Sequence, residues 1–451
     1  MNYVLVGLII YLVIILAVVL ISGRSRGNED YLIAERKLGV WRSTMTIMSS
    51  KIGSGLIMTY MAYIYLWGPP AIFSFIGMAI GYIVFAFFGR YLKHQADLHG
   101  YYTLPEIYRH MFGQKTGLLM GIIIFFVMFG SVAIQLIGGA HIVADAGGIS
   151  YIWSIIIICG IILFYLLLGG FKSVVATDFL QGICLFTLLP IFLFLAIKAT
   201  GNINTIDLSM AKEGIRNIPS FVMLGFLMPF AAPELWQRVY AIKNEKTVFK
   251  TMLTTALLYT LFGIVLGALG LYLRGLVGNI QPEMLLIAGF KVILPVALAS
   301  LGTIFMMAAV MSSADTYTFT AASLLVQDII NPLRKKTNSS QTVFDLRIWQ
   351  VLIMVGALTL GILFTRLTDI FTFVFGIYSI VGSVGIALMI RRDRLNNPFL
   401  PLLFGTLAMV VWIIFKGFNP FVAIPALLGT LVGFVVSWLV RLGKAADHVT
   451  G

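Results

Sequence analysis

The sequence predicts an all-α polytopic membrane protein. Of its 451 residues, 60% are hydrophobic and only 11% are charged, and the mean hydropathy is +0.99. In a soluble domain, about a quarter of all residues would be charged. Apolar runs recur along almost the whole chain, and each is long enough to cross about 30 Å of hydrocarbon as a helix. These observations exclude a soluble globular protein.

Thirteen apolar runs are long enough to serve as transmembrane helices. They lie near residues 3–22, 43–65, 71–92, 117–143, 151–169, 174–198, 219–240, 250–273, 295–328, 347–365, 367–390, 398–417 and 420–441. The first run has no basic segment before it and no small-residue cleavage site, so we expect a retained helix and not a signal peptide.

The distribution of basic residues predicts the orientation. With the N-terminus outside and the C-terminus inside, 23 of the 31 Lys and Arg lie on the inner side, 7 lie on the outer side, and Lys51 lies within the membrane. This asymmetry follows the positive-inside rule. The net charge of +13 therefore reflects topology and not nucleic-acid binding. We expect a multi-pass protein of the cell inner or plasma membrane.

Two predicted spans are interrupted by glycine or proline. The first contains Gly53-Ser54-Gly55, and the second contains Pro229 and Pro233, five helices later. Two repeats of five helices each must be inverted relative to one another, which is an architecture of transporters. We expect one transmembrane domain over 1–451, divided into an extra helix and loop (1–40), a first repeat (about 41–200), a second repeat (about 201–390) and two scaffold helices with a short tail (391–451).

Lys51 lies in the middle of the first interrupted span. A charge at this depth costs about 2.5–3.5 kcal/mol on insertion scales, so the side chain should face protein or a water-filled cavity. One interpretation is a fixed salt bridge with Asp178 or Asp315 that holds the bundle together. The other is a role in handling the ion or the substrate.

A polar stripe runs along the predicted span at 295–328. Ala309, Ser312, Ser313 and Thr316 share one helical face, with Asp315 at its edge. These oxygens either bind a ligand in a cavity or bond back to carbonyls one turn earlier.

Four stretches together resemble the sodium/solute symporter family, whose inverted five-plus-five helix fold is also seen in the bacterial leucine transporter. They are Glu29-Asp30-Tyr31-Leu32 through Leu38-Gly39, Gly169-Gly170-Phe171-Lys172 through Asp178 and Gln181, Trp236-Gln237-Arg238, and Met311-Ser312-Ser313-Ala314-Asp315. Their order and spacing match the family from about residue 1 to 441.

The resemblance implies two ion sites. One sodium site would take the carbonyls of Ser49, Ile52 and Ala309 and the hydroxyls of Ser312 and Ser313. A second ion site, present in only some members, would involve Asp178, Asp315 and Thr316. Lys51 departs from the family at a position where a neutral or acidic residue is expected. It could occupy the sodium position, contact the substrate or carry a proton.

The resemblance also suggests which residues surround the substrate, because the first, third, sixth and tenth core helices line the cavity in such proteins. The candidates are Ser54, Tyr60, Gln135, Phe226 and Tyr378.

We therefore predict a secondary active transporter that couples symport of a small polar organic solute to a cation gradient, with Na⁺ as the expected ion and no organic cofactor. The expected partners are the solute and the lipid bilayer, without nucleic acid or an obligatory protein partner. One alternative is a proton-coupled or uncoupled transporter in which Lys51 replaces sodium. Another is a transporter-like sensor, which the short tail after the last predicted helix disfavours. No nucleotide, zinc or acid–base motif indicates an enzyme, and Lys51 weakly favours an anionic solute.

Overall fold

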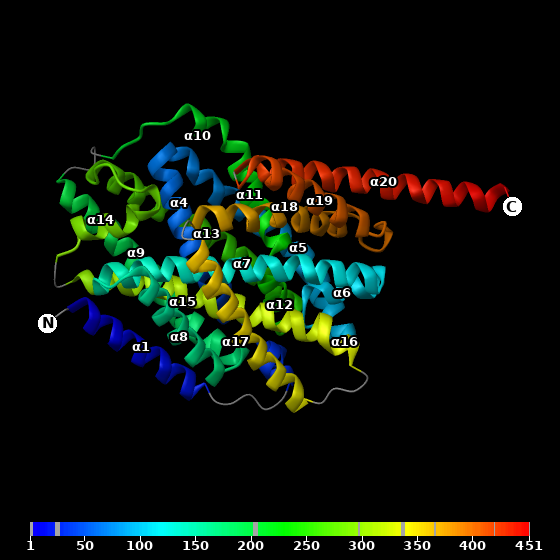
Figure 1. The fold of residues 1–451 in the computed structure, drawn as a ribbon, viewed down its shortest axis with the longest axis horizontal. Helices are drawn as coiled ribbons and strands as arrows, with labels where there is room; N and C mark the ends of the chain where they lie inside the picture. The colour runs from blue at the N-terminus through cyan, green and yellow to red at the C-terminus, as the bar shows by residue number, and fades with distance from the viewer. Residues whose placement is uncertain are drawn as a thin grey trace.

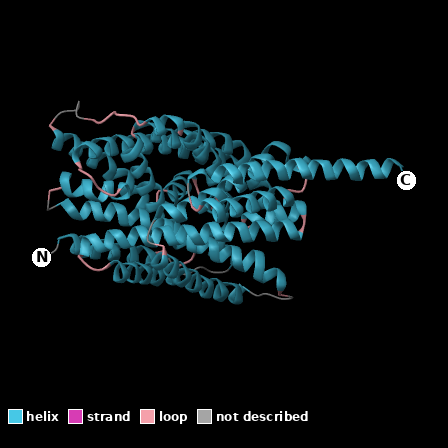
Figure 2. Ribbon diagram, turned by 45° about the horizontal axis from the view of Figure 1, so that its top comes forward, coloured by secondary structure: helices cyan, strands magenta, loops and turns pink. Residues whose placement is uncertain are grey.

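The computed structural model describes residues 3–22, 28–201, 206–295, 298–334, 339–364, 367–418 and 420–450, and this part of the chain folds into helices joined by short loops (Figure 2). The only extended pairing among these residues is an isolated bridge between Leu38 and Ile242. The all-helical prediction is confirmed.

Nine helices of the described chain are long and apolar enough to cross a membrane. Most of them run roughly side by side along the long axis of the molecule, and the end of α20 projects beyond the bundle (Figure 1). Many large apolar side chains on their outer faces are exposed, as expected of a surface that contacts lipid. The nine helices are α5 (Phe73–His99), α7 (Gln114–Gly147), α8 (Tyr151–Leu168), α9 (Phe171–Thr200), α13 (Glu245–Leu276), α17 (Ser339–Leu363), α18 (Leu367–Arg391), α19 (Phe399–Lys416) and α20 (Ala423–Thr450).

Two further predicted spans are broken in the middle, where the sequence predicts interruptions. The first consists of α3 (Val40–Lys51) and α4 (Ser54–Trp67), separated by Ile52 and an extended Gly53. The second consists of α11 (Ile218–Ala231) and α12 (Pro233–Ala241), which are bent by 48°. Pro233 cannot donate a backbone hydrogen bond, which explains why the helix stops at Ala232 and restarts.

The polar stripe lies on α15 (Ala299–Leu324), which continues into a π-helical stretch (Leu325–Ile330) and the short α16 (Asn331–Leu333). The chain begins with α1 (Tyr3–Ile21). Each expected span coincides with one helix or one broken pair. The number of membrane crossings, the sides of the two termini and the division into two repeats stay predictions.

Short helices lie at both ends of the bundle. α6 (Leu104–Phe112) and α16 lie toward one end, and α14 (Leu285–Ile293) lies toward the other (Figure 1). The Glu106 carboxylate accepts the backbone N–H of Thr103 at 3.0 Å, as expected of a helix that begins there. The remaining short elements are α2 (Asn28–Ile33), α10 (Lys212–Arg216), and the 3₁₀ turns η1 (Ala34–Arg36), η2 (Pro69–Ile72), η4 (Pro282–Met284), η7 (Arg392–Arg394) and η8 (Pro420–Val422).

Glycines allow the first half of the second broken span to pack closely on α5. A Cβ added at Gly77 would lie 2.1 Å from the carbonyl oxygen of Val222, and one at Gly225 would lie 2.1 Å from that of Ser74. Small residues at such contacts bring two helix backbones together, and this is the usual way helices associate in lipid. The packing fixes α11, and with it the second break, in the centre of the bundle.

Candidate ion and substrate site

The break in the first span meets the polar stripe of α15. The Ser312 hydroxyl donates to the carbonyl oxygen of Ser49 at 2.7 Å and also contacts the carbonyl oxygen of Ala309 at 3.2 Å. A Cβ on Gly53 would lie 2.4 Å from the Ser313 hydroxyl oxygen, so Ser313 lies directly against the break. The structure thus gathers Ser49, Ala309, Ser312 and Ser313 around the segment that contains Ile52.

These five predicted residues are all buried, and together they offer carbonyl and hydroxyl oxygens. The Ser313 hydroxyl has no hydrogen-bond partner among the described residues. A buried hydroxyl without a partner is costly, and a bound cation would satisfy it. Carbonyl and hydroxyl oxygens can replace the water shell of Na⁺, a hard cation.

Lys51 turns away from this group of oxygens and contacts the other broken span. Its ammonium forms an ion pair with Glu234, in the first turn of α12, and donates to the Tyr378 hydroxyl of α18 at 3.1 Å. The prediction from the sequence that Lys51 pairs with Asp178 or Asp315 is wrong. Those two aspartates belong to a second cluster, so Glu234 is the carboxylate that compensates the lysine.

The second cluster is organised by Arg238, one helical turn after Glu234. Its guanidinium contacts the Asp178 carboxylate at 2.8 Å and the Thr316 hydroxyl at 2.7 Å. Asp315 accepts hydrogen bonds from the Tyr165 hydroxyl at 3.2 Å and from the backbone N–H of Thr316 at 2.6 Å. The three candidates for a second ion site therefore lie together, with the positive charge of an arginine already among them.

The two clusters do not balance their charges when all groups are ionised. Lys51 and Arg238 carry two positive charges, whereas Glu234, Asp178 and Asp315 carry three negative ones, and all five side chains are buried. Unpaired charge inside a membrane bundle is expensive. A proton on one of the carboxyl groups, or one additional monovalent cation, would make this region neutral.

The substrate candidates fall into different environments. Gln135 accepts hydrogen bonds at 2.8 Å from both the backbone N–H and the hydroxyl of Ser54, so these two residues fix the break against α7. Tyr378 takes part in the Lys51 contact. Phe226 packs against Phe230, at 5.8 Å between ring centroids, and lines neither cavity described below.

Tyr60 lines a small cavity beside the two breaks. This cavity reaches the first turn of α4, at Leu56, and the last turn of α11, at Met228. No charged side chain lines it. Its lining consists of Leu56, Thr59, Tyr60, Tyr63, Ser74, Met78, Leu224, Gly225, Met228 and Phe371.

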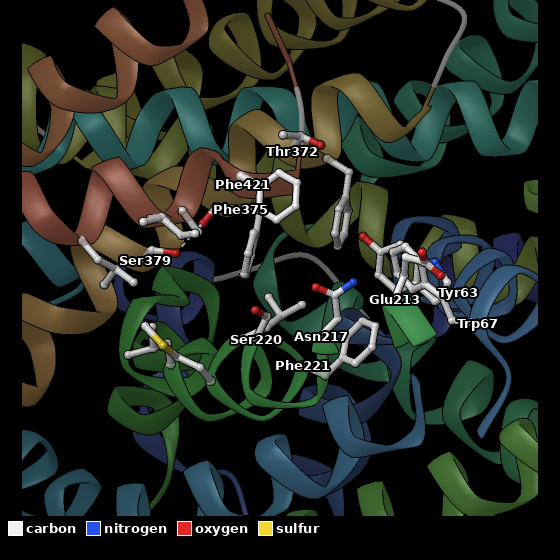
Figure 3. Close-up of a pocket in the computed structure, with 17 residues that line it drawn as sticks. Tyr63, Trp67, Glu213, Asn217, Ser220, Phe221, Thr372, Phe375, Ser379 and Phe421 are labelled. Atoms are coloured by element: carbon white, nitrogen blue, oxygen red, sulfur yellow. Dashed lines mark hydrogen bonds between the residues drawn. The ribbon is translucent and has the colours of Figure 1, made fainter. Parts of the chain in front are cut away.

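A larger cavity of about 260 Å³ lies further along the same helices (Figure 3). Phe375, Phe421 and Thr372 lie on one side of it, facing Phe221 of α11 and Asn217, the residue before α11, across the opening (Figure 3). Three residues, Tyr63, Leu224 and Phe371, line both cavities and so form the partition between them.

Comparison with known proteins identifies the family of the chain. A model of the sodium:solute symporter family matches residues 31–392, which include both broken spans, α15 and α18. The chain belongs to the sodium:solute symporter family. The family is one of sodium-coupled membrane symporters of small solutes, which confirms the predictions of a multi-pass plasma-membrane protein, of sodium-coupled symport and of a protein that is not an enzyme.

Individual relatives are distant but extend over most of the chain. A sodium/proline symporter of Staphylococcus aureus is 22% identical over 365 residues, which cover 74% of this chain and 70% of that protein. The osmoregulated proline transporter OpuE of Bacillus subtilis (strain 168) is 22% identical, with 93% and 91% of the two chains covered. The structure of a Na⁺-coupled sialic acid symporter superposes with a TM-score of 0.81 at 18% identity and covers 97% of both chains, which shows the same fold.

Glu234 is the functional candidate that sequence reasoning missed, whereas Arg238 was recognised only as part of a family stretch. Both follow Pro233, the start of the second half of the broken span. A carboxylate beside the second break could have been recognised as the partner of a lysine beside the first, because inverted repeats bring the two breaks together at the middle of the membrane.

Proposed function

We propose that this symporter binds its coupling sodium ion between the first broken span and α15. The ligands would be the carbonyl oxygens of Ser49, Ile52 and Ala309 and the hydroxyls of Ser312 and Ser313. The observation that carries this proposal is the 2.7 Å contact between the Ser312 hydroxyl and the Ser49 carbonyl oxygen, which brings donor atoms of the two helices to one point. One further observation supports it, the unpartnered Ser313 hydroxyl.

The contacts of Lys51 favour sodium over a lysine that substitutes for it. An ammonium in the sodium position would have to donate to the carbonyl oxygens of the break. Instead its partners are Glu234 and Tyr378, on α12 and α18. The neutral oxygens next to Ser313 are therefore left for an exchangeable ion.

We propose a compact zwitterion as the class of solute. The first turn of α4 and the last turn of α11 both reach the small cavity, whose volume of about 30 Å³ must increase before it can hold such a solute. Backbone dipoles give the first a partial positive charge and the second a partial negative charge, so the two helix ends complement a carboxylate and an ammonium on one small molecule. Glu234 compensates Lys51, which removes the reason to expect an anionic solute. The proline transporters among the relatives make proline the first compound to test.

Uptake into proteoliposomes tests both the coupling to sodium and the class of solute. A sodium gradient, with choline as the control ion at equal ionic strength, should drive accumulation of a radiolabelled zwitterion such as proline. Pyrrolidine, which is a cation without the carboxylate, and acetate, which is an anion, should not compete. Competition by acetate but not by other zwitterions would contradict the solute class. Equal uptake in choline would contradict sodium coupling at this site.

A further inference from the structure

The Lys51 ammonium lies in a cage that other helices provide. Glu234 of α12 pairs with it, the Tyr378 hydroxyl of α18 lies 3.1 Å away, and the ring centroids of Tyr378 and of Tyr317 on α15 lie 4.9 and 5.6 Å from Nζ. The side chains of Lys51 and Glu234 are 4% and 1% exposed, so water does not screen the pair.

Without the lysine, the cage would still present groups that can bind a cation. A carboxylate, a hydroxyl oxygen and two aromatic faces are the groups that bind a small monovalent or ammonium cation away from water. The Glu234 Oε2 atom has no hydrogen-bond partner among the described residues, so the carboxylate has spare capacity for a ligand. Removing one partner of such a buried pair leaves an uncompensated charge that attracts another cation or a proton.

We propose that Glu234, Tyr317 and Tyr378 form a second monovalent-cation site, which Lys51 occupies permanently as a tethered ammonium. The ion in this site is part of the chain, so it cannot exchange during transport. The symporter accordingly moves no solution ion through this position. The proposal does not depend on the sodium site at Ser312, because the two sites use different residues.

Chemical rescue tests the proposal. Lys51→Ala removes three methylenes and the ammonium, and n-propylammonium supplies nearly the same group in solution. We expect the thermal midpoint of purified Lys51→Ala to rise by at least about 2 °C in n-propylammonium over choline at equal ionic strength, since a ligand that binds only the folded state stabilises it. Wild type, whose cage is filled, should not respond.

Two further variants control for unspecific effects. Lys51→Ala/Glu234→Gln keeps the vacated space but removes the anion, so it should not respond to n-propylammonium. Lys93→Ala removes an equally buried lysine whose carboxylate partner, Asp97, has a side chain that is 44% exposed and can be solvated by water. This variant should not respond either.

The experiment still tests the cation site when Lys51→Ala is too unstable to purify. If Lys51→Ala does not accumulate, expression and purification in n-propylammonium should restore its yield. The yield of the double variant should be the same with and without n-propylammonium. Equal responses of the single and double variants, or no rescue of Lys51→Ala in either experiment, would overturn the proposal. If sodium did not stabilise the wild-type protein, that result would contradict only the proposed sodium site at Ser312.

Discussion

At the scale of single residues, the break in the first span depends on a glycine that has no room for a side chain. A Cβ at position 53 would lie 2.4 Å from the Ser313 hydroxyl oxygen and 2.6 Å from the Gln135 amide oxygen. The sequence predicts the break, because glycine is permissive and the span is otherwise apolar. The reason for glycine at this position is a contact with two distant helices, and no local pattern contains that information.

Gly53→Ala should therefore destabilise the protein and weaken sodium binding together. Overpacking at this position should cost about 1–3 kcal/mol, since the two oxygens must move apart. Gly160→Ala is the matched control, because nothing lies within 4 Å of its added Cβ on α8, and a helical alanine is favoured over glycine. Unfolding in mixed detergent micelles measures the change in stability. A stable Gly53→Ala with wild-type sodium affinity would show that the break tolerates a side chain.

At the scale of elements, the breaks and the polar stripe were predictable and the ion pairs were not. Interruptions by glycine or proline and a run of small polar residues are local patterns. The pairs Lys51–Glu234 and Asp178–Arg238 join residues far apart in sequence, and their choice depends on how helices pack. Lysine at position 51 predicts a buried partner, but the predicted spans hold five carboxylates that could pair with it, Asp178, Glu234, Asp315, Asp328 and Asp369.

The Asp178–Arg238 pair ties α9 to α12, and it should contribute strongly to stability. Arg238→Met leaves Asp178 buried without its cation, which should cost about 3–5 kcal/mol. Lys291→Met removes a lysine from an ion pair with Asp145 at 2.5 Å whose side chains are 63% and 30% exposed, and the loss there should stay below about 1 kcal/mol. Similar losses in the two variants, measured by the same unfolding assay, would mean that the buried pair does not hold these helices together.

At the scale of the whole molecule, the two broken spans bring together the proposed ion site, the Lys51–Glu234 ion pair and the cavity beside Tyr60. The helical symporter fold was predictable from the interrupted apolar spans together with the four family stretches. The cavities were not, because their lining comes from α4, α5, α11 and α18 and depends on side chains that pack in three dimensions. Tyr60 was predicted for the substrate site and lines the cavity, whereas Phe226 packs on Phe230 instead.

Equilibrium binding of radioactive sodium to the purified protein tests the central claim most directly. Wild type should bind sodium saturably, and Ser312→Ala/Ser313→Ala should need at least about tenfold more sodium for half-saturation, because hydrogen-bond-type contacts to a charge contribute about 1.5–3 kcal/mol each. Ser323→Ala, which removes a buried hydroxyl of α15 that donates to the Phe319 carbonyl oxygen at 2.9 Å, should bind as wild type does. Unchanged sodium affinity in the double variant would contradict a sodium site between the first broken span and α15.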